Sequence, residues 1–581
     1  MSPPGPVART RSSAPRPLAI AESLRALLAR GLAACLALLV GAAGTVWGRA
    51  ASPSDPAPEL GVLAGRSLAG LAGARAAGAR TVGLVADWSV IEARQGHPVW
   101  DDLDRAVAAT AREGLMPVVI LAHTPRWASL GSGPDLMRPE VFTRQPPRDA
   151  RDWDRFVGLA VARYRGRVRD WQVWTHLGLP AFRGTGSEYL TLLQTAAARI
   201  RALDAQARVI AASPAGVDLG FVVRLAETAP AAFDAVVVPA VGMSPEALLR
   251  PLGVLVPRLG HRGKGIWLQW APDRSADAAR ATGEWLKMLL VADATGVRRL
   301  VAADIEDAAG ALRQAVTRLG ARRVTGHLVR DPDVFVAAAE SSADGILAAW
   351  ARTAGRTLDL PAAPGIQALP LDGRADALEL RDGRVVAHLR EVPTVLTGVP
   401  ADLLAEARAT AARTPWVPVP ARDYSGSREV VARLGRPGEE HGLYNAAYRH
   451  RPNGAVEVVD VDGGEAVRTS VGRGVVYVYF DVDDTFVYFA EGRVPLEVHV
   501  EVWGARAPRQ LGFNLLYDAA GGYRFTPWVW VEPGDGWRTY TIRLPDASFA
   551  NTWGYDFAVN AAGNRAEDLT VRTVRVRKVA P

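Results

Sequence analysis

The sequence predicts an α/β protein built on a (β/α)8 TIM barrel, followed by two all-β parts. Between residues 59 and 322, eight short apolar runs each precede a helix-like amphipathic run. Parallel barrel strands are buried on both faces, so they read as nearly continuous apolar stretches, and this alternation is typical of such a barrel. The expected strands lie at 59–65, 81–88, 116–123, 168–174, 207–213, 234–241, 264–271 and 298–304.

The character of the chain changes after the barrel. Residues 323–399 hold short alternating strands with Asp-Gly turns, which predicts a small antiparallel β-module. Residues 400–424 read as a helix and a linker. Residues 425–581 are dense in evenly spaced strands with no helix signal, which predicts a β-sandwich of jelly-roll type.

The N-terminal region predicts a membrane segment. Residues 1–30 form a basic, disordered arm, 31–48 an apolar stretch, and 49–58 a linker. Five arginines precede the apolar stretch, which favours an uncleaved signal anchor with a cytoplasmic N-terminus. The expected location is the inner (cytoplasmic) membrane, with a single pass and a periplasmic or extracellular main body. A signal peptide cleaved near residues 48–50 and a buried soluble helix remain alternatives.

Composition excludes several classes of protein. The single cysteine, Cys35, excludes an intrachain disulfide framework and a cysteine-clustered metal site. The net charge of +7 is modest for 581 residues, and no basic stripe is concentrated beyond the N-terminal arm, so we expect no nucleic-acid partner.

Four barrel segments carry a resemblance to a known group: residues 78–129, 153–174, 179–213 and 264–270. They resemble bacterial retaining glycoside hydrolases of the family 39-like group, in particular membrane-anchored enzymes associated with exopolysaccharide synthesis. The resemblance implies a TIM barrel, an envelope polysaccharide as partner, possible contact with the exopolysaccharide machinery, and a carbohydrate-binding-like sandwich. It also implies two glutamates, at the ends of strands 4 and 7, about 5–5.5 Å apart.

Both glutamates are replaced in this chain. The strand-4 motif that the resemblance implies is Trp-x-Val-Trp-Asn-Glu-Pro, and here Thr175 stands for the asparagine and His176 for the acid/base glutamate. The strand-7 alignment places Trp270 at the position of the nucleophile. Gly83 stands where a strand-2 arginine is expected. The sequence therefore predicts a degenerate hydrolase.

Other carboxylates could take over catalysis. The candidates near the expected barrel mouth are Asp87, Asp273, Asp304 and Glu306, although each is equally explained as a helix cap or a solvated side chain. His123 and His176 are thin evidence for a metal site, so we expect no metal and no other cofactor. The acids of residues 480–484 are either a solvated turn or calcium ligands.

A sugar-binding surface is expected at the strand ends, because indole faces stack on pyranose rings and polar side chains bind hydroxyls. Some of these tryptophans could instead close the core, and aromatics of the sandwich are open to the same two interpretations. The predicted substrate-binding residues are Trp88, His123, Arg126, Trp127, Trp174, Thr175, His176, Gln269 and Trp270.

The prediction is thus a glycoside-hydrolase-like protein that binds envelope polysaccharide without hydrolysing it. Two alternatives stay open: an active O-glycosyl hydrolase that uses relocated carboxylates, and a structural envelope component with a protein partner.

Overall fold

The structure is a computed structural model in which two compact units, residues 1–48 and 49–581, are distinguished. The predicted membrane segment, residues 31–48, lies outside the described residues. No helix in the described part of the chain is both long and apolar enough to cross a membrane. The structure describes residues 57–579 with the exception of 66–67, 179–180, 273–276, 304, 330, 362, 364, 373–377, 436–438, 447–454, 505–509 and 566. For residues 305–308 it describes the backbone but not the side chains.

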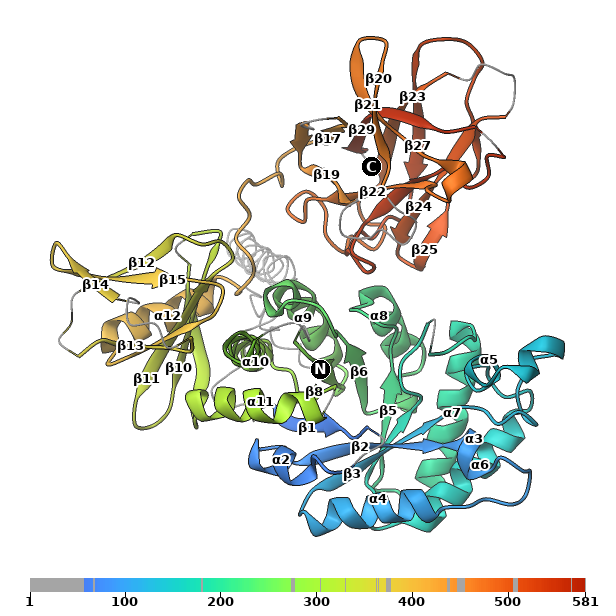
Figure 1. Cartoon of the computed structure of the whole chain (residues 1–581), viewed down its shortest axis with the longest axis vertical. Helices are drawn as coiled ribbons and strands as arrows, with labels where there is room; N and C mark the ends of the chain where they lie inside the picture. Colours follow the sequence, from blue (N-terminus) through green and yellow to red (C-terminus); the bar gives the residue numbers. More distant parts are fainter. Residues whose placement is uncertain are drawn as a thin grey trace, which may run out of the picture. The chain divides into compact units, whose positions relative to one another are not determined.

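Eight parallel strands close into a barrel in sequential order, which confirms the predicted TIM barrel. In Figure 1 helices lie around these strands. The strands are β1 (Glu59–Leu63), β2 (Thr81–Asp87), β3 (Met116–Ala122), β4 (Asp170–Val173), β5 (Arg208–Ala212), β6 (Ala235–Pro239), β7 (Gly265–Trp270) and β8 (Arg299–Ala302). The helices are α2 (Leu71–Ala76), α3 (Trp88–Ile91), α4 (Asp101–Arg112), α5 (Pro139–Phe142), α6 (Ala150–Tyr164), α7 (Gly186–Leu203), α8 (Leu219–Thr228), α9 (Pro245–Gly260), α10 (Ala278–Thr295) and α11 (Ile305–Leu319).

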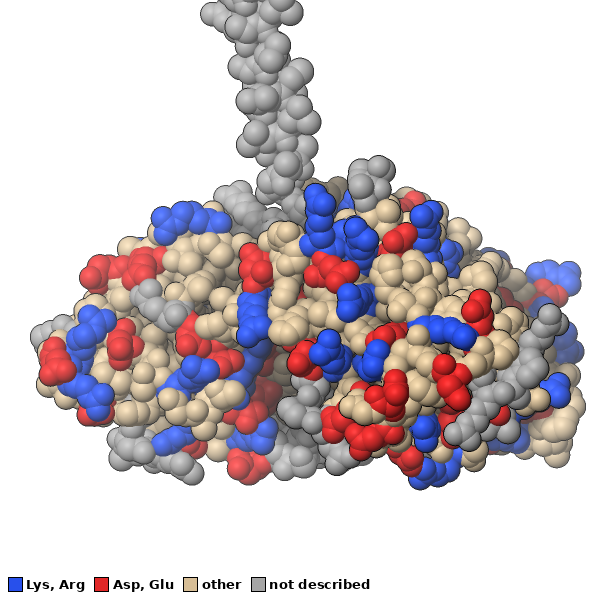
Figure 2. All heavy atoms as spheres, turned by 90° about the horizontal axis from the view of Figure 1, so that it is seen from above, with Lys and Arg blue, Asp and Glu red and all other residues tan. Residues whose placement is uncertain are grey.

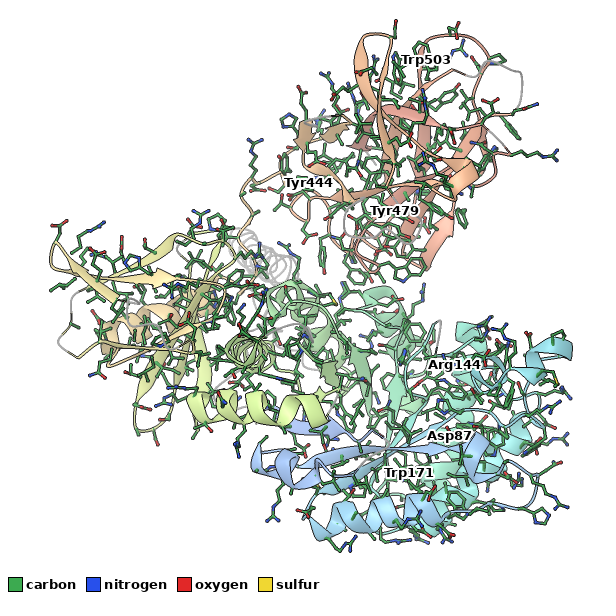
Figure 3. The ribbon with its side chains drawn as sticks, viewed as in Figure 1. Asp87, Arg144, Trp171, Tyr444, Tyr479 and Trp503 are labelled. Carbon is green, nitrogen blue, oxygen red and sulfur yellow. The ribbon has the colours of Figure 1, made fainter. Side chains whose placement is uncertain are left out.

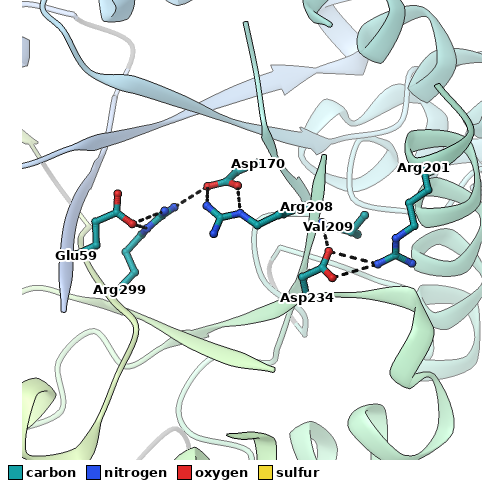
Figure 4. A network of polar contacts seen from close by, with 7 residues as sticks. All are labelled: Glu59, Asp170, Arg201, Arg208, Val209, Asp234 and Arg299. Atoms are coloured by element: carbon teal, nitrogen blue, oxygen red, sulfur yellow. Dashed lines mark hydrogen bonds and ion pairs between the residues drawn. The ribbon is translucent and has the colours of Figure 1, made fainter. Parts of the chain in front are cut away.

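A network of charges, in which Arg299 and Asp170 are buried, lies at the end of the barrel where its strands begin. Arg299, only 2% exposed, donates to Glu59 at 2.6 Å and to Asp170 at 3.1 Å, and its guanidinium lies 3.8 Å from the centre of the Trp267 ring. Asp170 also accepts two hydrogen bonds from Arg208 (Figure 4). All four charged residues are the first residues of their strands, so the opposite end of the barrel is left for a ligand.

The β-module holds a five-stranded sheet, in the order β13-β16-β11-β10-β9, and a three-stranded sheet, β12-β15-β14. At the β14–β15 turn Asp382 and Gly383 both have positive φ, as the Asp-Gly turn signal predicts. The elements are β9 (Arg323–Leu328), β10 (Val334–Glu340), β11 (Gly345–Ala351), β12 (Arg356–Pro361), β13 (Gln367–Pro370), β14 (Leu378–Arg381), β15 (Arg384–Leu389), β16 (Thr394–Thr397) and α12 (Ala401–Arg413).

One histidine of this module is buried without a polar partner. His327, on β9, stacks on Trp416 with ring centroids 6.0 Å apart. Its Nε2 has no hydrogen-bond partner among the described residues. Burial lowers the pKa of His327 to about 4, because the charged imidazolium would lose its hydration.

The C-terminal part is a two-sheet β-sandwich, as predicted, with sheets of seven and six strands around one apolar core. Strand β23 shows the expected alternation, since every second residue is buried. The strands are β17 (Glu429–Arg433), β18 (Glu439–His441), β19 (Leu443–Asn445), β20 (Glu457–Val461), β21 (Gly464–Arg468), β22 (Tyr477–Val482), β23 (Leu496–Trp503), β24 (Gly512–Ala519), β25 (Gly522–Phe525), β26 (Val529–Trp530), β27 (Trp537–Leu544), β28 (Phe557–Asn560) and β29 (Thr570–Lys578).

Charged side chains of both signs are interspersed over the face shown in Figure 2. Among the described residues, many charged side chains form ion pairs. Arg151 with Asp149 and Arg280 with Glu391 are examples, each at 2.6 Å. Exposed pairs of this kind contribute little to stability individually.

Candidate functional site

A cavity of about 350 Å³ opens at the ends of the barrel strands, within the size range of small-molecule sites. Its walls come from the ends of β1, β2, β3, β4 and β7 and from loops that follow them. Most of its lining surface is apolar, although six of the twelve lining residues carry hydrogen-bonding side chains. The lining residues are Leu63, Ala64, Gly83, Val85, Ile120, His123, Arg144, Gln172, Thr175, His176, Ala181 and Gln269.

His123 follows β3 and is held by the last residue of β2. Its Nδ1 lies 2.8 Å from Oδ2 of Asp87. The other carboxylate oxygen of Asp87 accepts hydrogen bonds from the amide and hydroxyl of Ser89, so Asp87 is also the N-cap of α3. Burial alone would raise the pKa of Asp87, but its bonds with His123 and Ser89 outweigh burial and lower it, so the carboxyl is ionised at neutral pH. Asp87 is therefore an anchor for the imidazole. Figure 3 labels Asp87 and Arg144 in the barrel.

Arg144 reaches the cavity from the long loop between β3 and α6. Thr124, directly after His123, donates its amide to Thr143 O at 2.8 Å and its hydroxyl to Gln145 O at 2.6 Å. These bonds tie both neighbours of Arg144 to the end of β3, and the amide of Arg183 donates to Arg144 O. Sequence reasoning missed Arg144, because only tertiary contacts bring this loop to the cavity.

The end of β4 supplies three polar lining residues. Gln172 points into the barrel and donates to the carbonyls of Trp174 and Thr175 at 2.9 and 3.1 Å, which holds the turn carrying Thr175 and His176. Burial, together with the positive charge of Arg144, lowers the pKa of His176. His176 is therefore neutral at pH 7 and its ring offers one N–H donor. Gln172 was also missed by the sequence analysis.

On β7, the residue that lines the cavity is Gln269, and Trp270, which the sequence analysis placed at the position of the nucleophile, does not line it. Trp270 points outward to the helices: its Nε1 donates to Met243 O at 2.8 Å and its ring lies edge-on to Trp285 of α10 at 4.8 Å. Neighbouring strand residues point to opposite faces, so Gln269 must point inward when Trp270 points outward. An amide thus lines the cavity together with the imidazole of His176.

Gly83 lines the cavity on β2, where the resemblance implied an arginine. A Cβ at this position would lie 2.5 Å from Cδ2 of Leu63 and 3.4 Å from Cδ1 of Ile120. A long side chain therefore does not fit here unless Leu63 moves. The apolar side chain of Leu63 occupies the space.

The expected aromatic rim is not formed. Trp88, Trp174 and Trp270 are buried in the core, at most 1% exposed, and offer no ring face to a ligand. Trp127 is half-buried, with its Nε1 bonded to Glu92 O and Arg155 over its ring. Arg126 is exposed and contacts Met137, away from the lining. Of the nine predicted binding residues, the cavity unites His123, Thr175, His176 and Gln269.

The four fallback carboxylates do not form a described pair. Asp87 is engaged with His123 and Ser89. Asp273 and Asp304 lie outside the described residues, as does the side chain of Glu306. No carboxylate lines the cavity within the described part of the chain, whereas glycoside hydrolysis uses two carboxyl groups flanking the bond.

The acids of residues 480–484 have protein partners. Asp483 accepts from Thr485 and from the hydroxyl of Tyr444, and Asp484 pairs with Arg250 at 2.9 Å. Burial raises the pKa of Asp484 to about 6. The part of the chain that the structure describes contains no group of three or more His, Cys, Asp or Glu residues arranged to hold a metal.

The sandwich aromatics fall into both predicted groups. Tyr517, on β24, is in the sandwich core. Tyr477 and Tyr479, on β22, stack with ring centroids 5.6 Å apart on the face of β22 that points away from this core. Trp553, 47% exposed, stacks on Tyr523 at 4.0 Å. This part of the sandwich presents one open indole face.

Comparison with known proteins gives similarity to solved structures alone. No protein-family model matches the chain. No curated protein matches it. A family 39 glycoside hydrolase from the gut symbiont Bacteroides cellulosilyticus WH2 is 14% identical, with a TM-score of 0.48 over 59% of this chain and 81% of that one.

Two further structures are similar at the same level. A GH30 endoxylanase from Clostridium papyrosolvens C71 is 12% identical, with a TM-score of 0.43 over 60% of this chain and 98% of that one. A glucosidase from Croceicoccus marinus is 11% identical, with a TM-score of 0.40 over 91% and 98%. These values assign neither a family nor a substrate. The closed, sequentially ordered eight-stranded barrel identifies the fold of this chain as a (β/α)8 barrel with C-terminal β-domains.

Proposed function

We propose that the cavity at the barrel mouth binds a saccharide and that the chain does not hydrolyse glycosidic bonds. The observation that carries the proposal is the lining itself: His176 and Gln269 face the cavity at the ends of β4 and β7. Retaining barrels use carboxylates from strand ends of this kind to attack and protonate the substrate. An amide and a neutral imidazole can hydrogen-bond a hydroxyl but cannot replace an acid and a nucleophile.

The composition of the lining supports a sugar ligand. His123, Arg144, Gln172, Thr175, His176 and Gln269 supply hydrogen-bonding groups, while Leu63, Val85 and Ile120 supply apolar surface. Sugar rings need both, because they carry hydroxyls at their edge and C–H groups on their faces. Binding sites in (β/α)8 barrels are found at this end of the strands.

The proposal includes a location. Residues 31–48 anchor the chain in the cytoplasmic membrane, and the barrel faces the periplasm or the exterior, where it contacts envelope polysaccharide and the exopolysaccharide machinery. The support is the apolar stretch with arginines on its N-terminal side. Membrane fractionation of the full chain and of a variant lacking residues 31–48 tests this. We expect the full chain in the membrane fraction and the deletion variant in the supernatant. If both chains appear in the supernatant to the same extent, the anchor is refuted.

The binding proposal is tested with matched glutamine variants. The full chain is titrated with a panel of neutral and acidic oligosaccharides, and reducing ends are assayed in parallel. Gln269→Leu removes the amide in the cavity. Gln206→Leu is the control, because Gln206 is exposed in the turn before β5, at the opposite end of the barrel.

Binding by the wild type and by Gln206→Leu, with at least a tenfold loss in Gln269→Leu and no product that contains added water, supports the proposal. Release of reducing ends with uptake of water refutes it in favour of hydrolysis by relocated carboxylates. No binding to any saccharide, with a folded protein by circular dichroism, favours the structural role.

A further inference from the structure

We propose that the barrel mouth is a β-elimination site for 4-linked uronate glycans, with His123 as the catalytic base and Asp87 as its positioning residue. The inference rests on the proposed function, because it names the sugar and the chemistry of the same cavity. Elimination cleaves a glycan with a base and with groups that neutralise the uronate carboxylate. It has no use for the pair of carboxylic acids that hydrolysis requires.

The contact between Asp87 and His123 fixes which nitrogen is the base. An ionised carboxylate only accepts hydrogen bonds, so the 2.8 Å contact requires the proton on Nδ1 of His123. In the neutral imidazole the lone pair then lies on Nε2. His123 lines the cavity, and within the described part of the chain its only hydrogen bond is the one to Asp87. The arrangement is that of a base oriented by a third group.

The backbone at His123 is strained, which is a second observation for a functional role. His123 has a φ of 67°, a left-handed conformation that is uncommon in residues other than glycine. The two hydrogen bonds of the next residue, Thr124, to the 143–145 loop hold this conformation in place. Strained residues of this kind cluster at active sites and ligand clamps.

Three donors stand where a sugar carboxylate would be received. Arg144 carries a fixed positive charge, and it lies close enough to His176 to lower the pKa of that imidazole. Neutral His176 and the amide of Gln269 add N–H donors from β4 and β7. No carboxylate lines the cavity among the described residues, so an anionic ligand meets no like charge in that lining.

The chemical step balances with His123 alone. Neutralisation of the uronate carboxylate makes the C5 hydrogen acidic, and Nε2 of His123 takes that proton. The C5–H electron pair becomes the second bond between C4 and C5, and the C4–O4 bond breaks. The leaving O4 takes the proton back from His123, which restores the neutral base. One group serves both transfers when C5–H and O4 lie on the same ring face, as in 4-linked mannuronate.

The experiment uses the full chain in detergent micelles with a mannuronate hexasaccharide. The substrate control is the same hexasaccharide with its carboxylates reduced to alcohols. Ultraviolet absorbance detects the C4=C5 bond conjugated to the carboxylate, mass spectrometry detects whether water has been added, and equilibrium dialysis measures binding. The expected result is an absorbing product from the uronate only, with no water added.

Three variants identify the roles. His123→Gln removes the base and is expected to lower kcat at least 100-fold. Asp87→Asn preserves the cap of α3 but releases the imidazole, so kcat falls at least tenfold while KM stays within twofold, which a merely structural role would not produce. His261→Gln is the matched control, since His261 is exposed at the end of α9.

The outcomes separate the two proposals. An absorbing product that depends on His123 supports the inference. Binding of the uronate without any absorbing product overturns the inference and leaves the saccharide site intact. Binding of the reduced hexasaccharide alone overturns the uronate assignment. Products that contain added water overturn both proposals. No binding of either compound overturns the uronate inference, and the saccharide proposal is then decided by the wider oligosaccharide panel.

Discussion

Replacing the buried His327 by phenylalanine is expected to remove an acid sensitivity of the β-module. The ring keeps its stack on Trp416, while the unpartnered Nε2 and its titration are lost. The folded pKa is about 4, whereas an unfolded histidine titrates near 6.5. Between these values the unfolded chain binds more protons, so the stability of the wild type falls as the pH falls through this window.

The size of the effect follows from the two pKa values. Relative to its value at pH 8, the contribution of His327 to the free energy of unfolding is lower by about 2 kcal/mol at pH 5 and by about 3 kcal/mol at pH 4. Other groups in the chain also titrate in this range. The informative quantity is therefore the difference between His327→Phe and the wild type at each pH.

Hydrogen exchange of peptides from 323–351 measures that difference locally, which matters because a multidomain chain does not unfold in one step. The ratio of wild-type to variant protection is expected to be nearly constant above pH 7 and to fall about 30-fold by pH 5. His388→Phe, on β15 of the same module, controls for the loss of an imidazole. Parallel pH curves for wild type and His327→Phe would refute the reasoning.

Three further predictions concern the barrel and the sandwich. Arg299→Met takes one of two cations from buried Asp170, which keeps Arg208, and takes the cation from partly exposed Glu59. We expect it to destabilise the barrel by about 2 kcal/mol in thermal unfolding, whereas exposed Arg298→Met has little effect; equal shifts would contradict the network. Trp270→Phe loses the hydrogen bond to Met243 O, so we expect the free energy of unfolding to fall by about 1 kcal/mol. Saccharide affinity, measured by titration calorimetry, is expected to stay unchanged. A loss of affinity would place the indole in the binding site. Burial raises the pKa of Asp518 to about 7, so the folded chain binds a proton that the unfolded chain has lost between about pH 4 and 7. In urea titrations, the stability of the wild type relative to Asp518→Asn should therefore fall as the pH rises through this range. A rise in relative stability would refute the prediction.

The barrel was predictable from the sequence because its strands are buried on both faces and each is followed by an amphipathic helix. β3, for example, reads as a nearly unbroken apolar run from Met116 to Ala122. The turns of the β-module were equally local signals, since Asp382-Gly383 adopts the positive φ that this dipeptide favours.

The site was predicted only in part, because direction and tertiary contact decide it. On strand 7 the sequence analysis expected Trp270 at the cavity, whereas Gln269 lines it and the indole of Trp270 bonds to Met243 O. Trp88 begins α3 and packs into the core, where its Nε1 donates to Glu92. Nothing local in the sequence marks Arg144, because Thr124 brings its loop to the cavity.

A crystal structure of the chain soaked with the saccharide that binds it most tightly examines the central claim most directly. We expect sugar density in the barrel cavity, between Gln269 on one side and His176 on the other, with an intact or eliminated chain. Sugar density found only on the sandwich, or two carboxylates flanking a glycosidic bond at the barrel mouth, would contradict the account.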